Sequence, residues 1–263
     1  MLWERDSQRI VEIVRTSFTL VIHPRVPQEA KGVVIPKPNK PDYGVSTPDR
    51  VITLLNCVGR VVEKVAANAI AEECERQGLL HKRQFGCRKR RPAIDVFGRW
   101  LKGVEEAWER GNTVAVLLVD VEGAFPHVAK GHLIQRMEEM GFDAKQVRLV
   151  GHVMEERKVI MSMDGMEGDS MDVEMGVLQG SPVCPVLFIL YLSGLLGEAE
   201  EKEKQLGSEG ISFVDDVAWV EEGEHVGGCT QGLGRCATET QIWVKENACQ
   251  FEIGKTESVL FTG

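Results

Sequence analysis

The chain has 263 residues, 43% of them hydrophobic, and a formal net charge of -9. That length suits one large domain or two small ones with a hydrophobic core. Seven cysteines, an odd number without a Cys-x-x-Cys pair, argue against a disulfide framework or a zinc site and favour an intracellular setting, nucleus or cytoplasm. The longest apolar stretch, 185–196, is too short to cross a bilayer, and the N-terminus lacks the apolar core of a signal peptide.

The charge divides unevenly along the chain. Residues 1–100 hold 18 Lys and Arg against 11 Asp and Glu, a balance of +7, whereas the remainder has a balance of -16. Basic residues concentrate in segment 81–91, called the basic segment below, which also contains Phe85. This composition suits nucleic-acid phosphates together with a ring for base stacking. A solvated cationic loop explains it equally well.

Apolar spacing and turn residues predict alternating helices and strands without an internal repeat. Residues 24–50 carry most of the prolines and are expected to be extended or looped. Helices are predicted at 60–76, 94–110, 129–140, 143–156, 183–204 and 226–244. Strands are predicted at 114–119, near 159 and 173, as a β-hairpin at 211–220, and as two short strands in 251–261. The order resembles a split βαβ arrangement, an α+β fold in which helices cover one face of a mainly antiparallel sheet.

Three carboxylates follow or interrupt apolar runs. Asp120 ends the run 114–119, and Asp215-Asp216 lies at the centre of 211–220. Clustered hard oxygen ligands at strand ends are what a two-metal phosphoryl-transfer site requires. The alternatives are a helix cap for Asp120 and an ordinary turn for the pair. Adjacent like charges are costly unless neutralised, which favours a metal site and a nucleic-acid polymerase.

Two further segments are candidates for contact with a nucleotide. The Gly-rich turn 176–182 precedes a helix, so its backbone amides and Gln179 could contact a nucleotide and its template base. A simple strand-to-helix turn is the alternative, preferred for this segment taken alone. Lys255 stands just before an apolar strand, where a single lysine is usually a surface residue.

Together these segments resemble the reverse-transcriptase domain of LINE-type, non-LTR retrotransposons, and more particularly the fungal elements. Segments 34–39 with 50–56 resemble the first fingers motif, and 84–89 with Asp95 the second. The palm motifs match, in the family's order, 120–125, 178–182, 213–216 and 255–261. The resemblance implies a right-hand polymerase palm plus fingers, with 1–112 as the basic fingers-like region. Residues 113–263 would be the palm, with fingers elements interleaving near 129–175.

The resemblance implies a two-metal mechanism. Asp120 and Asp215 would bind two Mg²⁺ ions, for which Mn²⁺ could substitute, together with the backbone carbonyl of Val121. Asp216 would be a supporting ligand, and Lys255 would protonate the leaving pyrophosphate.

The resemblance also implies nucleotide contacts. Lys37 and Arg50 would bind the triphosphate, and Gln179 and Gly180 would line the base-pair pocket. Phe125 would stack under the sugar and exclude a 2′-hydroxyl; its alternative is a core phenylalanine.

For nucleic acid, the resemblance implies that Arg88 contacts the backbone, and the charge division extends this expectation to Lys89, Arg90 and Arg91. The implied partners are an RNA template, a DNA primer and deoxyribonucleoside triphosphates. No association with a membrane is expected. The oligomeric state stays open.

The chain departs from the family pattern in several places. Val51 stands where proline is usual, Glu122 replaces a frequent basic residue, and Pro126 a frequent polar one. The chain also stops directly after the last palm motif, so a helical thumb is expected to be absent. A second hypothesis is therefore a degenerate or domesticated remnant that binds RNA or a protein partner without turnover. A third, RNA-templated RNA synthesis, is disfavoured by Phe125.

Overall fold

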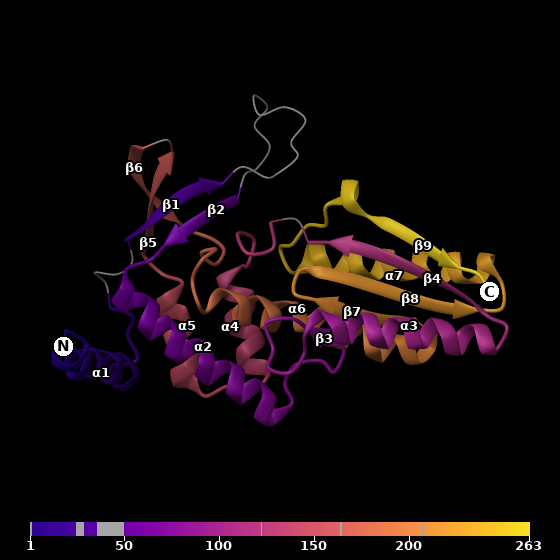
Figure 1. Ribbon diagram of the computed structural model, residues 1–263, viewed down its shortest axis with the longest axis horizontal. Helices are drawn as coiled ribbons and strands as arrows, with labels where there is room; N and C mark the ends of the chain where they lie inside the picture. Colours follow the sequence, from indigo (N-terminus) through magenta and orange to yellow (C-terminus); the bar gives the residue numbers. More distant parts are fainter. Residues whose placement is uncertain (1, 25–28, 36–49, 122, 164, 207) are drawn as a thin grey trace.

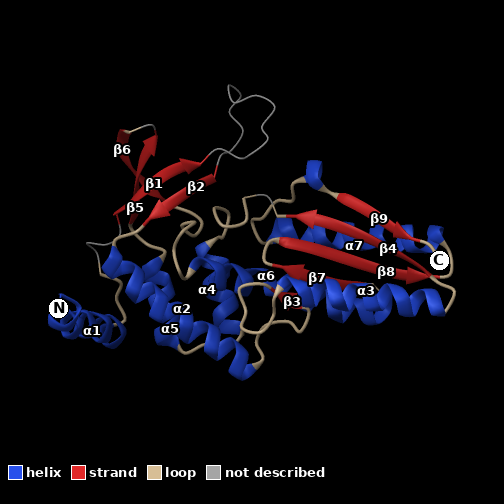
Figure 2. Cartoon of the chain, in the orientation of Figure 1, coloured by secondary structure: helices blue, strands red, loops and turns tan. Residues whose placement is uncertain are grey.

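The computed structural model describes residues 2–24, 29–35, 50–121, 123–163, 165–206 and 208–263. The chain forms an elongated molecule with a β-sheet toward each end and helices between and around them (Figures 1 and 2). Among the described residues, no helix combines the length and apolar character needed to cross a membrane.

The smaller sheet has four strands in the order β2-β1-β5-β6. Its strands are β1 (Glu29–Ile35), β2 (Arg50–Leu54), β5 (Arg157–Met163) and β6 (Met166–Val173). β1 is antiparallel to β2 but parallel to β5, so segments far apart in the sequence share one sheet. Leu178, just before Gln179 in the Gly-rich turn, belongs to the small core of this sheet with Ala30 and Val159. The sheet therefore supports that turn.

The larger sheet has five strands in the order β3-β7-β8-β4-β9. These are β3 (Gln84–Phe85), β4 (Thr113–Asp120), β7 (Glu209–Phe213), β8 (Asp216–Gly223) and β9 (Glu257–Phe261). All neighbours are antiparallel except the short β3–β7 pair. The predicted hairpin is β7–β8.

Helices cover both faces of this larger sheet. Odd positions of β4 and β8, such as Val119 and Val217, pack with α6 (Cys184–Leu206) and α7 (Val226–Glu246). Even positions, such as Val116 and Val220, pack with α3 (Ala93–Glu109) on the opposite face. Because side chains alternate along a strand, Asp120 and Asp216 belong to the even positions, on the face shared with α3.

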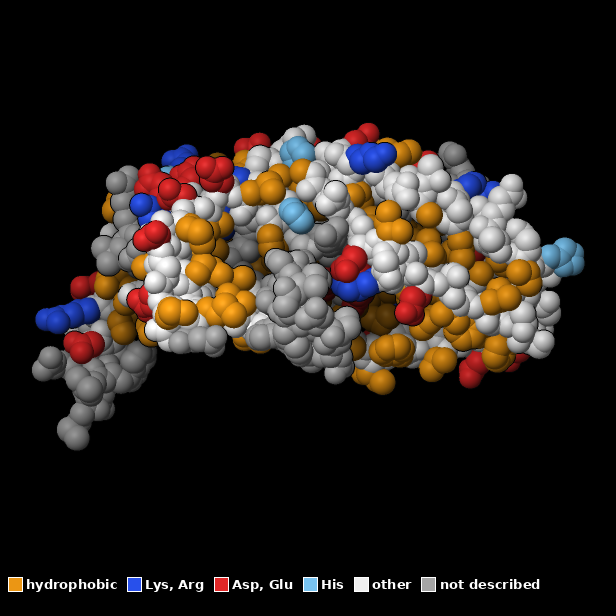
Figure 3. Space-filling view, turned by 90° about the horizontal axis from the view of Figure 1, so that it is seen from above, with side chains coloured by type: hydrophobic (Ala, Val, Ile, Leu, Met, Phe, Trp, Pro, Cys, Tyr) orange, Lys and Arg blue, Asp and Glu red, His pale blue; other side chains and the backbone are white. Residues whose placement is uncertain are grey.

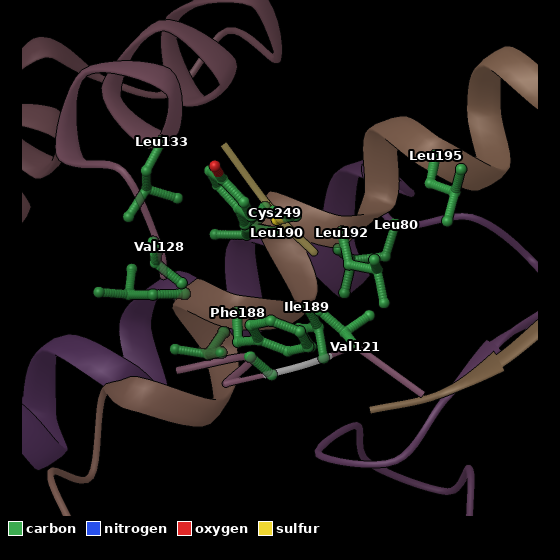
Figure 4. Packing of buried hydrophobic residues seen from close by; sticks show 14 of the residues in the cluster. Leu80, Val121, Val128, Leu133, Phe188, Ile189, Leu190, Leu192, Leu195 and Cys249 are labelled. Carbon is green, nitrogen blue, oxygen red and sulfur yellow. The ribbon is translucent and has the colours of Figure 1, made fainter. Parts of the chain in front are cut away.

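The main core surrounds the first half of α6. Phe188, Ile189 and Leu190 are each at most 1% exposed, and they meet residues such as Leu133 and Val128 (Figure 4). Three more helices pack around the smaller sheet's side of this core: α2 (Cys57–Gln77), α4 (Lys130–Glu139) and α5 (Ala144–Val153). A helix that is apolar on all sides is stable only when neighbours enclose it, as here.

The predicted α+β class with a mainly antiparallel sheet is confirmed, and so are the six predicted helices and the hairpin. The helix α1 (Leu2–Leu20) and the strands β1, β2 and β3 were not predicted. The expectation that helices cover one face of the sheet is corrected, because α3 packs on the second face of the larger sheet. The prediction of two strands in 251–261 is wrong. Phe251 makes only an isolated bridge to Val121, and a 3-10 turn, Ile253–Lys255, separates it from β9.

Candidate active site

Two neighbouring strands bring the three carboxylates to the same end of the larger sheet. Asp120, the last residue of β4, lies directly opposite Asp216, the first residue of β8. The Val121 amide donates a hydrogen bond of 3.3 Å to the Asp215 carbonyl, which ties the segment after β4 to the β7–β8 turn. The cluster is therefore a consequence of the strand register.

The β7–β8 turn holds a strained residue. Val214 has a φ of 57°, unusual for a β-branched side chain, and its amide donates a hydrogen bond of 3.2 Å to the Phe85 carbonyl. A Cβ on Gly86 would come within 2.6 Å of the Val214 side chain, so glycine permits this approach. Such strain costs about 1 to 3 kcal/mol and persists where neighbours hold it. Here β3 holds the turn that presents Asp215.

The carboxylates perturb one another electrostatically. Burial raises the pKa of Asp215, and the negative charge of Asp120 raises it further. Burial, followed by the charges of Asp215 and Asp120, raises the pKa of Asp216. The Lys255 ammonium binds a carboxylate oxygen of Asp120 and also Glu252, and these hydrogen bonds raise the pKa of Lys255. The charges of Lys255 and Arg50 neutralise the three carboxylates only in part, since the pKa values of Asp215 and Asp216 are still raised.

The donor chemistry of this cluster fits hard divalent cations. All three side chains are carboxylates, and burial together with neighbouring negative charge raises the pKa of Asp215 and Asp216. A bound cation would neutralise that charge. Within the described ranges, no three His, Cys, Asp or Glu side chains already converge as a metal-binding group. With Lys255 bound to Asp120, these carboxylates would have to rearrange to coordinate metal.

A cleft of about 1380 Å³ lies over the carboxylates. Eight of the residues predicted for the site line it: Arg50, Asp120, Val121, Phe125, Gln179, Asp215, Asp216 and Lys255. α3 also contributes apolar side chains to the cleft, among them Phe97 and Trp100. Seen from above, acidic and basic side chains lie together near the middle of the molecule, between two areas richer in hydrophobic side chains (Figure 3).

Phe125 lies between the cleft and the core. It is partly buried, lines the cleft, and meets Phe188 edge to face with ring centroids 5.2 Å apart. Its carbonyl accepts a hydrogen bond of 2.8 Å from the Val177 amide, which joins this segment to the Gly-rich turn. The two explanations offered for Phe125, sugar contact and core packing, are therefore compatible.

The Gly-rich turn is held against β2. The Thr53 amide and hydroxyl each donate a hydrogen bond of 2.7 Å to the Gln179 carbonyl. Gly180 has a φ of +115°, and a Cβ there would lie 2.4 Å from the Thr53 carbonyl oxygen. Only glycine fits this position without displacing the backbone. Sequence reasoning missed Thr53, although it lies within the segment 50–56 that resembles a fingers motif.

Part of the basic segment is buried and bonded to other groups of the protein, which its composition did not indicate. The Arg88 side chain is 4% exposed; its guanidinium donates to Glu75 and to the carbonyls of His81 and Gln84. Phe85 is 3% exposed, which removes it as a base-stacking platform.

The other basic residues differ in exposure. Lys89 is exposed and pairs with Glu72 at 3.2 Å, and Arg90 is exposed. Arg91 lies over the Phe85 ring, 5.3 Å from its centroid. None of the residues 88–91 is part of the cleft lining. Lys37 and Glu122 lie outside the described residues.

Comparisons with known proteins identify a family for this chain. The family model "Reverse transcriptase (RNA-dependent DNA polymerase)" matches residues 35–261. The RNA-directed DNA polymerase from mobile element jockey of Drosophila funebris is 24% identical over 254 residues, 96% of this chain and 28% of that protein. The probable RNA-directed DNA polymerase from transposon X-element of Drosophila melanogaster is 24% identical over 87% of this chain and 25% of that protein.

The fold is also similar to solved telomerase structures. Telomerase from Candida tropicalis, in complex with a TWJ fragment of telomeric RNA, has a TM-score of 0.65 at 10% identity, over 89% of this chain and 41% of that one. The LINE-type resemblance is confirmed by the mobile-element relatives, whereas the narrower likeness to fungal elements stays a prediction. The chain spans little more than a quarter of the curated relatives it matches, and it belongs to the reverse transcriptase (RNA-dependent DNA polymerase) family.

Proposed function

We propose that this chain catalyses RNA-templated addition of deoxyribonucleotides to a primer 3′-hydroxyl. The observation that carries the proposal is the convergence, in one cleft, of three carboxylates with residues suited to bind each part of a nucleotide. The family match over most of the chain supports the same reaction.

In this proposal Asp120 and Asp215 hold two Mg²⁺ ions, or Mn²⁺ in their place, with the Val121 carbonyl and Asp216 as further ligands. The bound ions would supply Lewis acidity that favours deprotonation of the primer hydroxyl and neutralises the phosphates. Val121 is 3% exposed, and its amide is hydrogen-bonded to the Asp215 carbonyl, so its own carbonyl would be a rigid ligand.

Cationic side chains at the cleft complete the proposed chemistry. Arg50 is exposed and lines the cleft, and its charge offsets part of the rise in the pKa of Asp215. Its guanidinium would bind the triphosphate. Lys255 is protonated next to Asp120 and can donate a proton to the leaving pyrophosphate once its hydrogen bond to that carboxylate is released. Lys37 stays a proposed second triphosphate ligand.

Nucleotide selection is assigned to the cleft walls. Gln179 and Phe125 line the cleft, whereas Gly180 is not part of its lining. Gln179, with its neighbour Gly180, would contact the nascent base pair, and Phe125 would contact the sugar and disfavour a 2′-hydroxyl. Lys89 and Arg90, which are exposed, are better placed than Arg88 to bind phosphates of an RNA template and DNA primer.

The test is primer extension on poly(rA)/oligo(dT) with dTTP in Mg²⁺ buffer. The proposal expects extension that stops on addition of a chelator and that prefers dTTP to UTP. Binding of the template-primer without extension, in either Mg²⁺ or Mn²⁺, would instead favour a remnant that has retained binding alone. Preference for UTP would favour RNA synthesis.

A further inference from the structure

A buried carboxylate lies behind the Gly-rich turn, outside the cleft lining. Glu63, on the buried side of α2, is 4% exposed and accepts a hydrogen bond from the Ser181 hydroxyl. The same hydroxyl accepts a hydrogen bond of 3.3 Å from the Val183 amide just before α6. Ser181 follows Gln179 and Gly180 directly, so Glu63 connects the turn to α2.

The surroundings of Glu63 show that this carboxylate is built into the fold. Burial raises its pKa, while the Ser181 hydrogen bond and the charge of Arg157 lower it. Arg157 is 5% exposed and supplies a buried positive charge from the start of β5. His23 Nε2 lies 3.5 Å from a Glu63 oxygen, and burial lowers the pKa of His23, which keeps the imidazole neutral. Burying a carboxylate is costly unless it makes compensating contacts, and here the hydrogen bond from Ser181 and the charge of Arg157 supply them.

Two separate contacts therefore fix the Gly-rich turn, one on each side of Gly180. Thr53 binds the Gln179 carbonyl from β2, and Glu63 binds the Ser181 hydroxyl from α2. Because Gly180 already has a φ that other residues rarely adopt, the turn depends on such external contacts for its shape.

We propose that Glu63 is a positioning residue for nucleotide binding. Its hydrogen bond from Ser181 holds the Gln179–Gly180 turn in the shape that the incoming base pair requires. Loss of this bond therefore weakens nucleotide binding and leaves the maximal rate of incorporation unchanged. This inference rests on the function proposed above.

The chain offers a matched control for a purely structural role. Glu221 on β8 is 6% exposed, accepts a hydrogen bond from the Ser208 hydroxyl, and has an arginine, Arg235, 4.0 Å away. Burial raises its pKa as it does for Glu63. Glu221 is five positions beyond Asp216 on the strand, roughly 17 Å from it, and does not line the cleft.

The experiment measures single-nucleotide incorporation of dTTP on poly(rA)/oligo(dT) with Mg²⁺, which separates nucleotide affinity from the maximal rate. Glu63→Met keeps the side-chain length but cannot accept a hydrogen bond, and it should weaken dTTP affinity about tenfold, as should Ser181→Ala. Glu63→Gln keeps an acceptor and should restore near-normal affinity. Glu221→Met should lower the melting temperature and leave dTTP affinity unchanged.

Two results would overturn the inference: unchanged dTTP affinity in Ser181→Ala, or an equal loss of affinity in Glu221→Met. Ser181→Ala removes only a hydroxyl, so it provides the test if Glu63→Met does not fold. If the unaltered chain incorporates no dTTP, the proposed function fails separately. Amide hydrogen exchange at 179–183 then decides whether Glu63 holds the turn: exchange should be faster in Glu63→Met than in Glu221→Met, and equal exchange would refute the contact.

Discussion

Phe125→Val is the substitution that separates sugar selection from packing. The change removes the ring that lines the cleft and leaves a smaller apolar side chain at the site. Losing the edge-to-face contact with Phe188 costs about 0.5 to 1.5 kcal/mol. Losing apolar burial on a half-buried ring adds about 1 kcal/mol. The expected destabilisation is therefore about 1.5 to 2.5 kcal/mol, a fall in melting temperature of about 3 to 10 °C.

If the ring also excludes a 2′-hydroxyl, the substitution should change discrimination between sugars. Efficiency with UTP relative to dTTP should rise by at least about tenfold, because differential fit in a pocket is worth about 1 to 3 kcal/mol. The assay is kcat/KM for both nucleotides on the same RNA template, beside a thermal melt.

The control is Phe188→Val. Phe188 is fully buried, contacts the same ring from the core side, and does not line the cleft. It should lower the melting temperature without changing the sugar ratio. If Phe125→Val behaves like this control, with both efficiencies lowered together, Phe125 is a packing residue and the argument for deoxyribonucleotide selection is refuted.

Three further predictions concern neighbouring parts of the site. Arg88→Ala should cost about 1.5 to 3 kcal/mol of stability, because it removes the buried guanidinium that bonds the His81 and Gln84 carbonyls. Lys89→Ala should leave the melt unchanged and reduce the salt dependence of template-primer binding; the reverse pattern would restore Arg88 as a phosphate contact. Gly180→Ala should weaken dTTP affinity by at least about tenfold, since its Cβ would collide with the Thr53 carbonyl; normal affinity would contradict the turn's assigned role. Asp215→Asn should raise the melting temperature in metal-free neutral buffer, because burial and the charge of Asp120 raise the pKa of Asp215 and make its ionised form unfavourable. The rise in melting temperature should shrink as the pH falls, because the carboxyl of the unaltered chain then takes up a proton.

The positions of the three carboxylates at strand ends were predictable because the local sequence pattern that produces them is strong. Asp120 ends an apolar run and Asp215 interrupts another, and such residues fall at strand ends when the flanking residues form strands. Their juxtaposition depends on the register of β4 against β8, which pairs residues far apart in sequence. Composition alone cannot supply that register.

Burial of polar residues was the part that sequence could not predict. The sequence around Arg88 is basic, as is usual for an exposed arginine. In the folded chain its guanidinium instead bonds Glu75 and the carbonyls of His81 and Gln84. Glu63 interrupts the apolar face of α2 and would ordinarily be assigned to solvent. In both cases the partner lies on another element, so the signal exists only in the folded chain.

The most direct test of the central claim is single-turnover incorporation of dTTP on poly(rA)/oligo(dT), measured with and without Mg²⁺ for the unaltered chain and for Asp120→Asn. The account predicts Mg²⁺-dependent incorporation by the unaltered chain and its loss in Asp120→Asn, with template-primer binding retained and the melting temperature not lowered. Because Asp120 is proposed to contact both ions, rescue by Mn²⁺ should be partial at most. Incorporation at the unaltered rate by Asp120→Asn would contradict the assignment of these carboxylates as the catalytic site.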